Sequence, residues 1–247
     1  MQVTVLRHLN EIALVDGTIR LAVGMYAFGI VALHLRTKGM RLLGEEGVLI
    51  THTVAEEEAI HTVAPDVVIE KVAVHSFTEG NGAVQVDQCS LTLKDCDLRR
   101  QVSSLEGAKM LLQNCTFQRC HWPAVVVHGN AVIQDCVIQD CPGATGIQVE
   151  PAGEVAVVGT TIRRCQDGLF VTGKATIGNS SITACTQSGV FAWKTGGGPG
   201  VVTVEGGLIC EGNNSSNDEN EGDYVTDEGG EINGVAAEKI KQATALW

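Results

Sequence analysis

The sequence predicts an all-β fold, a parallel β-solenoid of about nine coils that ends in a C-terminal helix. Short runs of Val, Ile and Leu are separated by Gly, Asn and Asp, which is typical of many short strands. A pattern of about 20–25 residues recurs along most of the chain, as in repeat architectures. Each period has room for about three strands and carries no helical periodicity, which indicates one coil of a parallel solenoid.

The repeat centres on a small residue that usually follows an Asn, Asp or Gly. The small residues are Val72, Cys96, Cys115, Cys136, Thr160, Ser180 and Gly207. An apolar residue stands three positions earlier, at Ile69, Leu93, Leu112, Ile133, Val157, Ile177 and Val204. Another stands two positions later, at Val74, Leu98, Phe117, Ile138, Ile162, Ile182 and Ile209. Two apolar columns without a break are not expected by chance, so each unit is interpreted as one coil.

The small residues and the residues before them predict a bend followed by a stacked core position. Asn, Asp and Gly tolerate the left-handed conformation that a sharp bend requires. The cysteines of this column, and those of a second column five residues later, then stack on their counterparts about 4.8 Å away. We interpret them as compact core hydrophobes. Metal or redox chemistry is the alternative, but the C-x4-C spacing is not usual for zinc and no His is in register, so no metal or cofactor is expected.

Three segments are expected. Residues 1–211 form the solenoid with an N-terminal cap, and residues 212–233 form an acidic loop rich in Gly and Asn. Residues 234–247 carry apolar residues at helical spacing and predict an amphipathic helix that lays Trp247 against the solenoid or a partner.

Charge and hydropathy exclude several classes of partner. The formal net charge of −12 argues against a nucleic-acid ligand, because affinity for phosphates rests on Lys and Arg. The sequence contains no run of 18 apolar residues, so it predicts no membrane-spanning helix. The first residues do not read as a secretory signal, so the nine cysteines are expected to be reduced thiols in the cytoplasm.

The N-terminal stretch resembles the opening coils of right-handed parallel β-helix proteins of the pectate-lyase-like superfamily. The matching residues are Asp16, Gly17, Thr18, Ile19, Leu21, Gly24, Tyr26, Leu43, Gly44, Glu45, Gly47 and Ile50. The resemblance covers about residues 9–211 and implies a single-stranded right-handed parallel β-helix. The superfamily includes pectin-degrading enzymes and non-catalytic modules of F-box ubiquitin-ligase receptors and spindle adaptors, so fold alone leaves function open.

The motifs of the related enzymes are missing. The N-T-D, D-D, G-H-G and R-I-K motifs of polygalacturonases do not occur, and "VHGN" at residues 127–130 is only a partial match. The sequence therefore favours a non-catalytic scaffold or adaptor that binds protein partners in a cytoplasmic or cytoskeletal assembly. The alternative is a carbohydrate-active hydrolase or lyase. It would use one outward column of the first strand of each coil, formed by Asp87, Glu106, His128 and Glu150.

Two further surfaces are candidates for partner binding. An outward apolar face is expected to hold Val126, Phe170, Phe191 and Trp193, and Trp247 is added from the expected C-terminal helix. The acidic loop or the C-terminal helix could instead fold back over this face, or the face could stack against sugars. A basic edge is expected at matching turn positions, from Arg99, Arg100, Arg119, Arg163 and Arg164, and could equally be ordinary solubilising charge.

Overall fold

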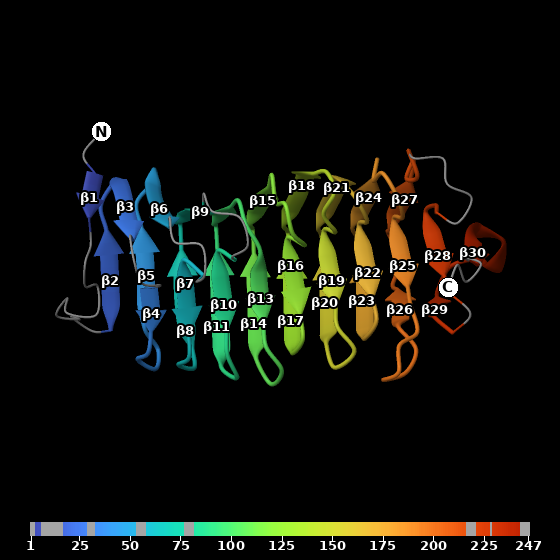
Figure 1. Cartoon of the computed structure of the whole chain (residues 1–247), viewed down its shortest axis with the longest axis horizontal. Coiled ribbons are helices and arrows are strands. Elements are labelled where there is room, and N and C mark those ends of the chain that lie inside the picture. Colours follow the sequence, from blue (N-terminus) through green and yellow to red (C-terminus); the bar gives the residue numbers. More distant parts are fainter. Residues whose placement is uncertain are drawn as a thin grey trace.

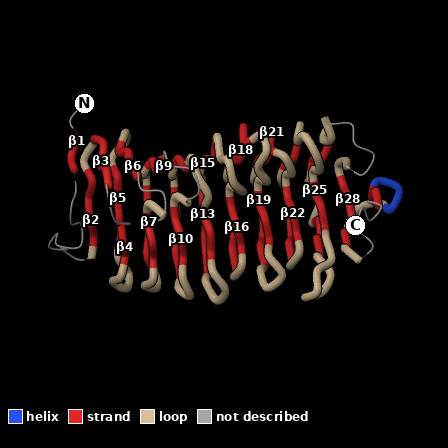
Figure 2. The backbone as a smooth tube through the Cα atoms, viewed as in Figure 1, coloured by secondary structure: helices blue, strands red, loops and turns tan. Residues whose placement is uncertain are grey.

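The chain forms one long parallel β-solenoid. The computed structural model describes residues 3–5, 17–28, 33–52, 58–76, 82–215, 221–227 and 229–242. Within these residues, three parallel sheets of ten strands each run side by side along the long axis of the molecule (Figure 1). Turns join the strands, and a short 3₁₀ segment lies at the C-terminal end (Figure 2).

The three sheets are named A, B and C. Sheet A contains β1 (Val3–Val5), β3 (Gly24–Phe28), β6 (Val48–His52), β9 (Ala73–Ser76), β12 (Asp97–Leu98), β15 (Thr116–Gln118), β18 (Val137–Cys141), β21 (Thr161–Cys165), β24 (Ser181–Thr183) and β27 (Ile209–Glu211). Sheet B contains β2 (Thr18–Leu21), β5 (Arg41–Gly44), β8 (Val67–Glu70), β11 (Ser90–Lys94), β14 (Lys109–Gln113), β17 (Asn130–Gln134), β20 (Glu154–Val158), β23 (Lys174–Gly178), β26 (Val201–Val204) and β29 (Glu231–Asn233). Sheet C contains β4 (Leu33–Leu35), β7 (Ile60–Thr62), β10 (Val84–Val86), β13 (Val102–Ser104), β16 (Val125–Val127), β19 (Ile147–Val149), β22 (Leu169–Val171), β25 (Val190–Ala192), β28 (Tyr224–Thr226) and β30 (Ile240–Gln242).

Each coil runs through sheet C, then sheet B, then sheet A. In the described part of the chain, the strands from β4 to β27 make eight complete coils, and partial coils continue at both ends. The all-β parallel solenoid is therefore confirmed, and its length is close to the nine coils expected.

The bend between sheets B and A follows the predicted Asn and Asp positions. Asp95, Asn114, Asp135 and Asn179 have φ between 48° and 54°, and Gly159 takes the same place with φ 63°. These residues tolerate the left-handed region better than others. The side chains also connect the coils, since the Asn114 amide donates a hydrogen bond to the Asp95 carboxylate at 2.5 Å.

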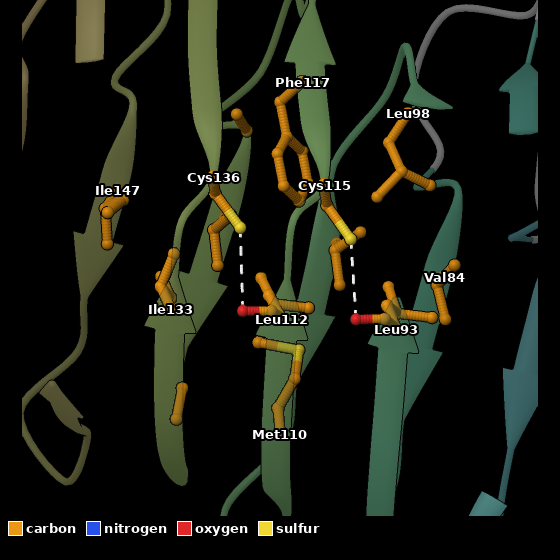
Figure 3. Packing of buried hydrophobic residues seen from close by; sticks show 14 of the residues in the cluster. Val84, Leu93, Leu98, Met110, Leu112, Cys115, Phe117, Ile133, Cys136 and Ile147 are labelled. Atoms are coloured by element: carbon orange, nitrogen blue, oxygen red, sulfur yellow. Dashed lines mark hydrogen bonds between the residues drawn. The ribbon is translucent and has the colours of Figure 1, made fainter. Parts of the chain in front are cut away.

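The interior consists of stacked columns of apolar side chains. Leu93, Leu112 and Ile133 are fully buried in successive strands of sheet B, and Phe117 fills the adjacent space (Figure 3). Val157 continues this column in the next strand, β20, and is also fully buried. Cys115 and Cys136 donate weak hydrogen bonds from Sγ to the carbonyl oxygens of Leu93 and Leu112, at 3.5 and 3.6 Å (Figure 3). The cysteine columns therefore belong to the core, as predicted.

All nine cysteines are free thiols, and eight are buried. Cys120, Cys141, Cys165 and Cys185 occupy one column in adjacent coils. Burial raises the pKa of the Cys185 thiol to about 11, so this thiol is protonated at neutral pH.

The last predicted repeat is shifted by one residue. Gly206 and Gly207 both have positive φ, at 48° and 66°, so the bend there takes two residues. The register pairs Ser181 with Ile209, which places Leu208 in the small column instead of Gly207. Ile209 consequently points outward and is 54% exposed.

The expected C-terminal organisation is wrong in the described residues. The region 212–233, expected to be a loop, contains β28 and β29, which extend sheets C and B. In place of the helix over 234–247 there is a 3₁₀ turn at Ala237–Lys239 and then β30, which pairs with β28. A short isolated helix is marginal in water, whereas a strand here satisfies the open edge of the sheet. Trp247 lies outside the described residues.

Candidate functional site

The outward face of sheet C carries the most distinctive side chains of the molecule. Its strands are mostly three residues long with buried ends, so the middle residue of each points outward. The resulting column runs through His34, His61, Gln85, Ser103, Val126, Gln148, Phe170, Phe191, Val225 and Lys241.

Three aromatic residues of this face form one cluster, here called the aromatic patch: Phe170, Phe191 and Trp193. The Phe170 ring meets Phe191 and Trp193 edge-on, with centroids 5.5 and 5.6 Å apart. Phe191 and Trp193 lie nearly parallel, at 5.9 Å and 10°. All three are only half-buried. The three aromatic residues that the sequence placed on one outward face therefore contact one another.

Val126 does not join the patch. It pairs in register with Gln148, which separates it from Phe170, and it is only 7% exposed. On the other side of the patch, Val225 lies between Phe191 and Lys241 in the column and is fully buried. The Lys241 ammonium donates a hydrogen bond to the Glu221 carbonyl at 2.8 Å, which holds this side chain at the end of the face.

A second column follows directly after the strands of sheet C. The register places Asp87, Leu105, His128, Glu150, Thr172 and Trp193 one residue beyond paired strand ends. The prediction of Glu106 in this column is wrong by one residue. Glu106 lies on an exposed turn beyond Leu105, because the preceding coil, β10 to β12, is shorter than its neighbours and offers no clear alignment in sequence.

The acidic residues of this column are held by polar neighbours. Asp87 Oδ2 lies 2.8 Å from His61 Nε2, and Asp87 Oδ1 accepts a hydrogen bond from the Gln85 amide at 3.1 Å. Glu150 accepts a hydrogen bond from the Gln148 amide at 2.6 Å. Each carboxylate is therefore bound to an outward side chain of its own or a neighbouring strand.

The spacing of the carboxylates does not match a glycosidase pair. Asp87 and Glu150 are three coils apart, which is about 14 Å at the inter-strand spacing, whereas glycosidases use about 5–9.5 Å. His128 and Glu150 are neighbours one coil apart. The column therefore contains one acid–base neighbour pair rather than four converging groups.

Sequence reasoning missed two histidines at the N-terminal end of the face. The rings of His34 and His61 lie 5.3 Å apart, and His61 contacts Asp87. The signal was present, because Leu33–Leu35 and Ile60–Thr62 both alternate buried, outward and buried residues. No shared motif connected the two segments.

The predicted basic edge is a mixed-charge edge. Its arginines occupy two adjacent columns at the end of sheet A. Arg163 donates two hydrogen bonds to Gln139, and Arg164 forms a bidentate pair with Asp140. The Arg164 guanidinium holds the pKa of Asp140 below its usual value. Of the others, Arg100 is 7% exposed, while Arg99 Nε lies 3.9 Å from Asp97.

Two cavities lie away from these residues. One, of about 470 Å³, is an open hollow over the outer face of sheet B, centred on β17. The other, of about 520 Å³, lies near the C-terminal end beside Cys210 and Tyr224. Across the residues that the structure describes, no three His, Cys, Asp or Glu side chains are placed to hold a metal ion together. No helix in the described ranges is long and apolar enough to cross a membrane.

Comparisons with known proteins agree with this architecture. No curated protein matches the sequence. Among solved structures, the pectin methylesterase from Aspergillus niger is similar at a TM-score of 0.60 and 14% identity, over 93% of this chain and 81% of that one. The pectin methylesterase from Yersinia enterocolitica is similar at 0.57 and 12% identity, over 90% of each chain. PfbA, a surface adhesin of Streptococcus pneumoniae, is similar at 0.53 and 11% identity, over 94% of this chain and 68% of that one.

These identities are low, so the solved structures establish the fold alone. Enzymes acting on carbohydrates and an adhesin share this architecture, which shows how widely the outer surface varies on one scaffold. The family profile of the right-handed β-helix region matches residues 46–209, which is most of the repeating part. The chain therefore belongs to the right-handed parallel β-helix family.

Proposed function

We propose that the protein is a non-catalytic binding scaffold that captures a protein partner on the aromatic patch of sheet C. One observation carries the proposal: Phe170, Phe191 and Trp193 point away from the core in adjacent coils and stay partly exposed. Large aromatic side chains contribute most to the core of protein interfaces, and contiguous exposed apolar area usually marks one.

The surroundings of the patch support recognition of a partner with both apolar and hydrogen-bonding groups. Glu150 and Gln148 lie on one side, and their mutual hydrogen bond holds both side chains in place. On the other side, the Lys194 backbone N–H donates a bifurcated hydrogen bond to both oxygens of the Asp227 carboxylate, at 3.0 Å each. A rigid aromatic centre with an ordered polar rim is typical of a protein-binding surface.

The cellular compartment of the protein is part of the same proposal. Cysteines in adjacent coils of one column lie within the range of backbone separations that disulfides span, and all nine are free. A reducing compartment such as the cytoplasm would keep them so. An adaptor role within a cytoplasmic or cytoskeletal assembly is compatible with this redox state.

Affinity capture from the native cell, followed by mass spectrometry, tests the proposal. The native protein is expected to retain a stoichiometric partner, and the variant Phe170→Ser with Trp193→Ser is expected to lose it. Trp122→Ser is the matched control, because Trp122 is 56% exposed and lies outside the patch. Equal retention of the partner by all three proteins would contradict the proposal.

A carbohydrate-active enzyme is the second candidate, supported by the neighbouring positions of His128 and Glu150 beside the aromatic patch. In this alternative His128 and Glu150 would share proton transfer, and the aromatic rings would stack on sugar units. Incubation of the native protein with pectin and alginate, with Glu150→Gln as control, tests it. Turnover that disappears in Glu150→Gln would establish the enzyme, and no turnover on either polymer would remove it.

A further inference from the structure

We infer that the outer face of sheet B docks on a second copy of this chain, through a two-fold axis that runs along β17. This face is separate from the aromatic patch, so the inference does not rest on the proposed partner. Three features carry it: an unpartnered apolar centre, unpaired charges on one rim, and the order of those charges along the sheet.

The centre of the face is apolar and exposed. Leu111, Val132 and Ala156 follow one another in the outward column of three adjacent strands. Val132 is 42% exposed, and so is Val158 at the edge of the same face. These residues line the hollow of about 470 Å³, which extends from β11 to β23 with β17 in the middle.

The rim beside this centre carries charges without partners. Lys109, Asn130, Glu154 and Lys174 stand in register at the beginning of β14, β17, β20 and β23, and all four are exposed. Within the described ranges, neither the Lys109 ammonium nor the Glu154 carboxylate makes an ion pair or hydrogen bond. Elsewhere on the surface, comparable side chains such as Arg164 and Asp140 are paired.

The order of the outward side chains along sheet B is complementary to that of a second copy of the chain. A two-fold axis along β17 reverses the order of the strands and keeps each outward column opposite itself. Lys109 then faces Glu154 of the second copy, Glu154 faces Lys109, and the two Asn130 side chains meet on the axis. Moving the axis to β20 would place Glu154 opposite itself, so the charges select β17.

Under the same axis, the facing apolar side chains of the two copies also complement each other in size. Leu111 faces Ala156 of the second copy, and Val132 faces Val132. A large residue therefore meets a small one and two residues of middle size meet each other, which suits two sheets packed about 10 Å apart. Towards the ends of the face, Glu70 of one copy opposes Glu205 of the other. Arg41 and Lys71 lie 3.8 Å from Glu70 and offset its charge.

The face is large enough for a stable dimer. Ten strands spaced about 4.8 Å apart, each of three to five residues at about 3.3 Å per residue, give a surface of about 700 Å². Stable interfaces bury about 600–1,000 Å² per partner. Because β17 lies near the middle of the ten strands, the two copies would overlap over almost the whole face.

Sedimentation of the purified chain with exchanged charges tests the dimer. The native protein is expected to sediment at twice the monomer mass. Glu154→Lys and Lys109→Glu each place like charges together at two symmetric contacts, so each is expected to raise the dimer dissociation constant by about tenfold or more. The double variant restores opposite charges and is expected to return to the native value.

Glu46→Lys is the matched control, since Glu46 is an exposed turn residue outside the face and its substitution should leave the dimer unchanged. Thermal melting of each variant shows that it is folded. A native protein that sediments as a monomer would overturn the inference. So would a dimer that survives both single changes, or a double variant that remains as weak as the single ones.

Discussion

The inward and outward residues of the same strands follow different rules. In β22, Leu169 and Val171 are fully buried, and the corresponding inward positions of the other coils are mostly Val, Leu or Ile, with the smaller buried residues Thr62, Ser104 and Ala192 in three coils. Phe170 stands between them on the outside, where the same column holds His, Gln, Ser and Val in other coils. Stacked coils require apolar residues of similar size inside, whereas nothing in the fold restricts the outside. The difference teaches that the inward columns specify the structure and the outward columns are free to specify binding.

A matched pair of phenylalanines gives the largest expected effect. Phe117 is fully buried in the core, and Phe170 is half-buried on the outer face. Phe117→Ala is expected to lower the free energy of unfolding by about 3–5 kcal/mol, because it leaves a cavity among packed coils. Phe170→Ala is expected to cost less than about 1.5 kcal/mol, the value of its aromatic contacts. Urea denaturation measures both, and equal losses would remove the distinction between inside and outside.

The carboxylate of Asp167 is a buried polar group in the connection between β21 and β22. Its oxygen accepts a hydrogen bond from the Ser188 backbone amide at 3.0 Å, and burial raises its pKa from 3.8 to about 6. Because the folded pKa is the higher one, the folded state binds the proton more tightly. This group therefore stabilises the fold less as pH rises from about 4 to about 6, by up to about 3 kcal/mol.

Asp167→Asn removes this titration and keeps an oxygen for the Ser188 amide. Relative to the native protein, the variant is expected to gain up to about 3 kcal/mol of stability between pH 4 and pH 8. Denaturation curves of both proteins at the two pH values measure the difference. A constant difference at both pH values would show that Asp167 is not a buried, strained charge.

Substitution within the cysteine column is expected to have the smallest effect. Cys136→Ser should cost only about 1 kcal/mol, because its hydroxyl finds an acceptor in the Gln134 carbonyl, 3.3 Å from the present sulfur. Ser180 already occupies this column and donates to the Gly178 carbonyl at 2.8 Å. A loss above about 3 kcal/mol in thermal or urea unfolding would mean that the sulfur fills space that oxygen cannot.

Sequence predicted the interior well because stacking imposes a period. The positions from Ile69 to Ile177 and the left-handed bends at Asp95 and Asn114 appear where expected. The period failed where a coil changed length, at the short coil before Glu106 and at the two-glycine bend before Leu208. A one-residue change in a turn leaves no mark on composition, yet it moves every following side chain.

The arrangement of the aromatic residues was predicted because they alternate with regular inward positions. Phe170, Phe191 and Trp193 were found because regular strands surround them. His61 was missed because its importance comes from Asp87 and His34, which stand in other coils. The C-terminal strand β30 was mistaken for a helix because its apolar spacing suits both structures, and only the open edge of sheet C decides between them.

The central claim is that the aromatic patch serves binding rather than folding. Equilibrium unfolding of the Phe170→Ser and Trp193→Ser double variant tests it most directly. The account predicts cooperative unfolding with an unchanged dependence on denaturant, and a free energy within about 2 kcal/mol of the native value. A loss as large as that of Phe117→Ala, or the disappearance of the cooperative transition, would show that the patch is part of the packing that holds the last coils together.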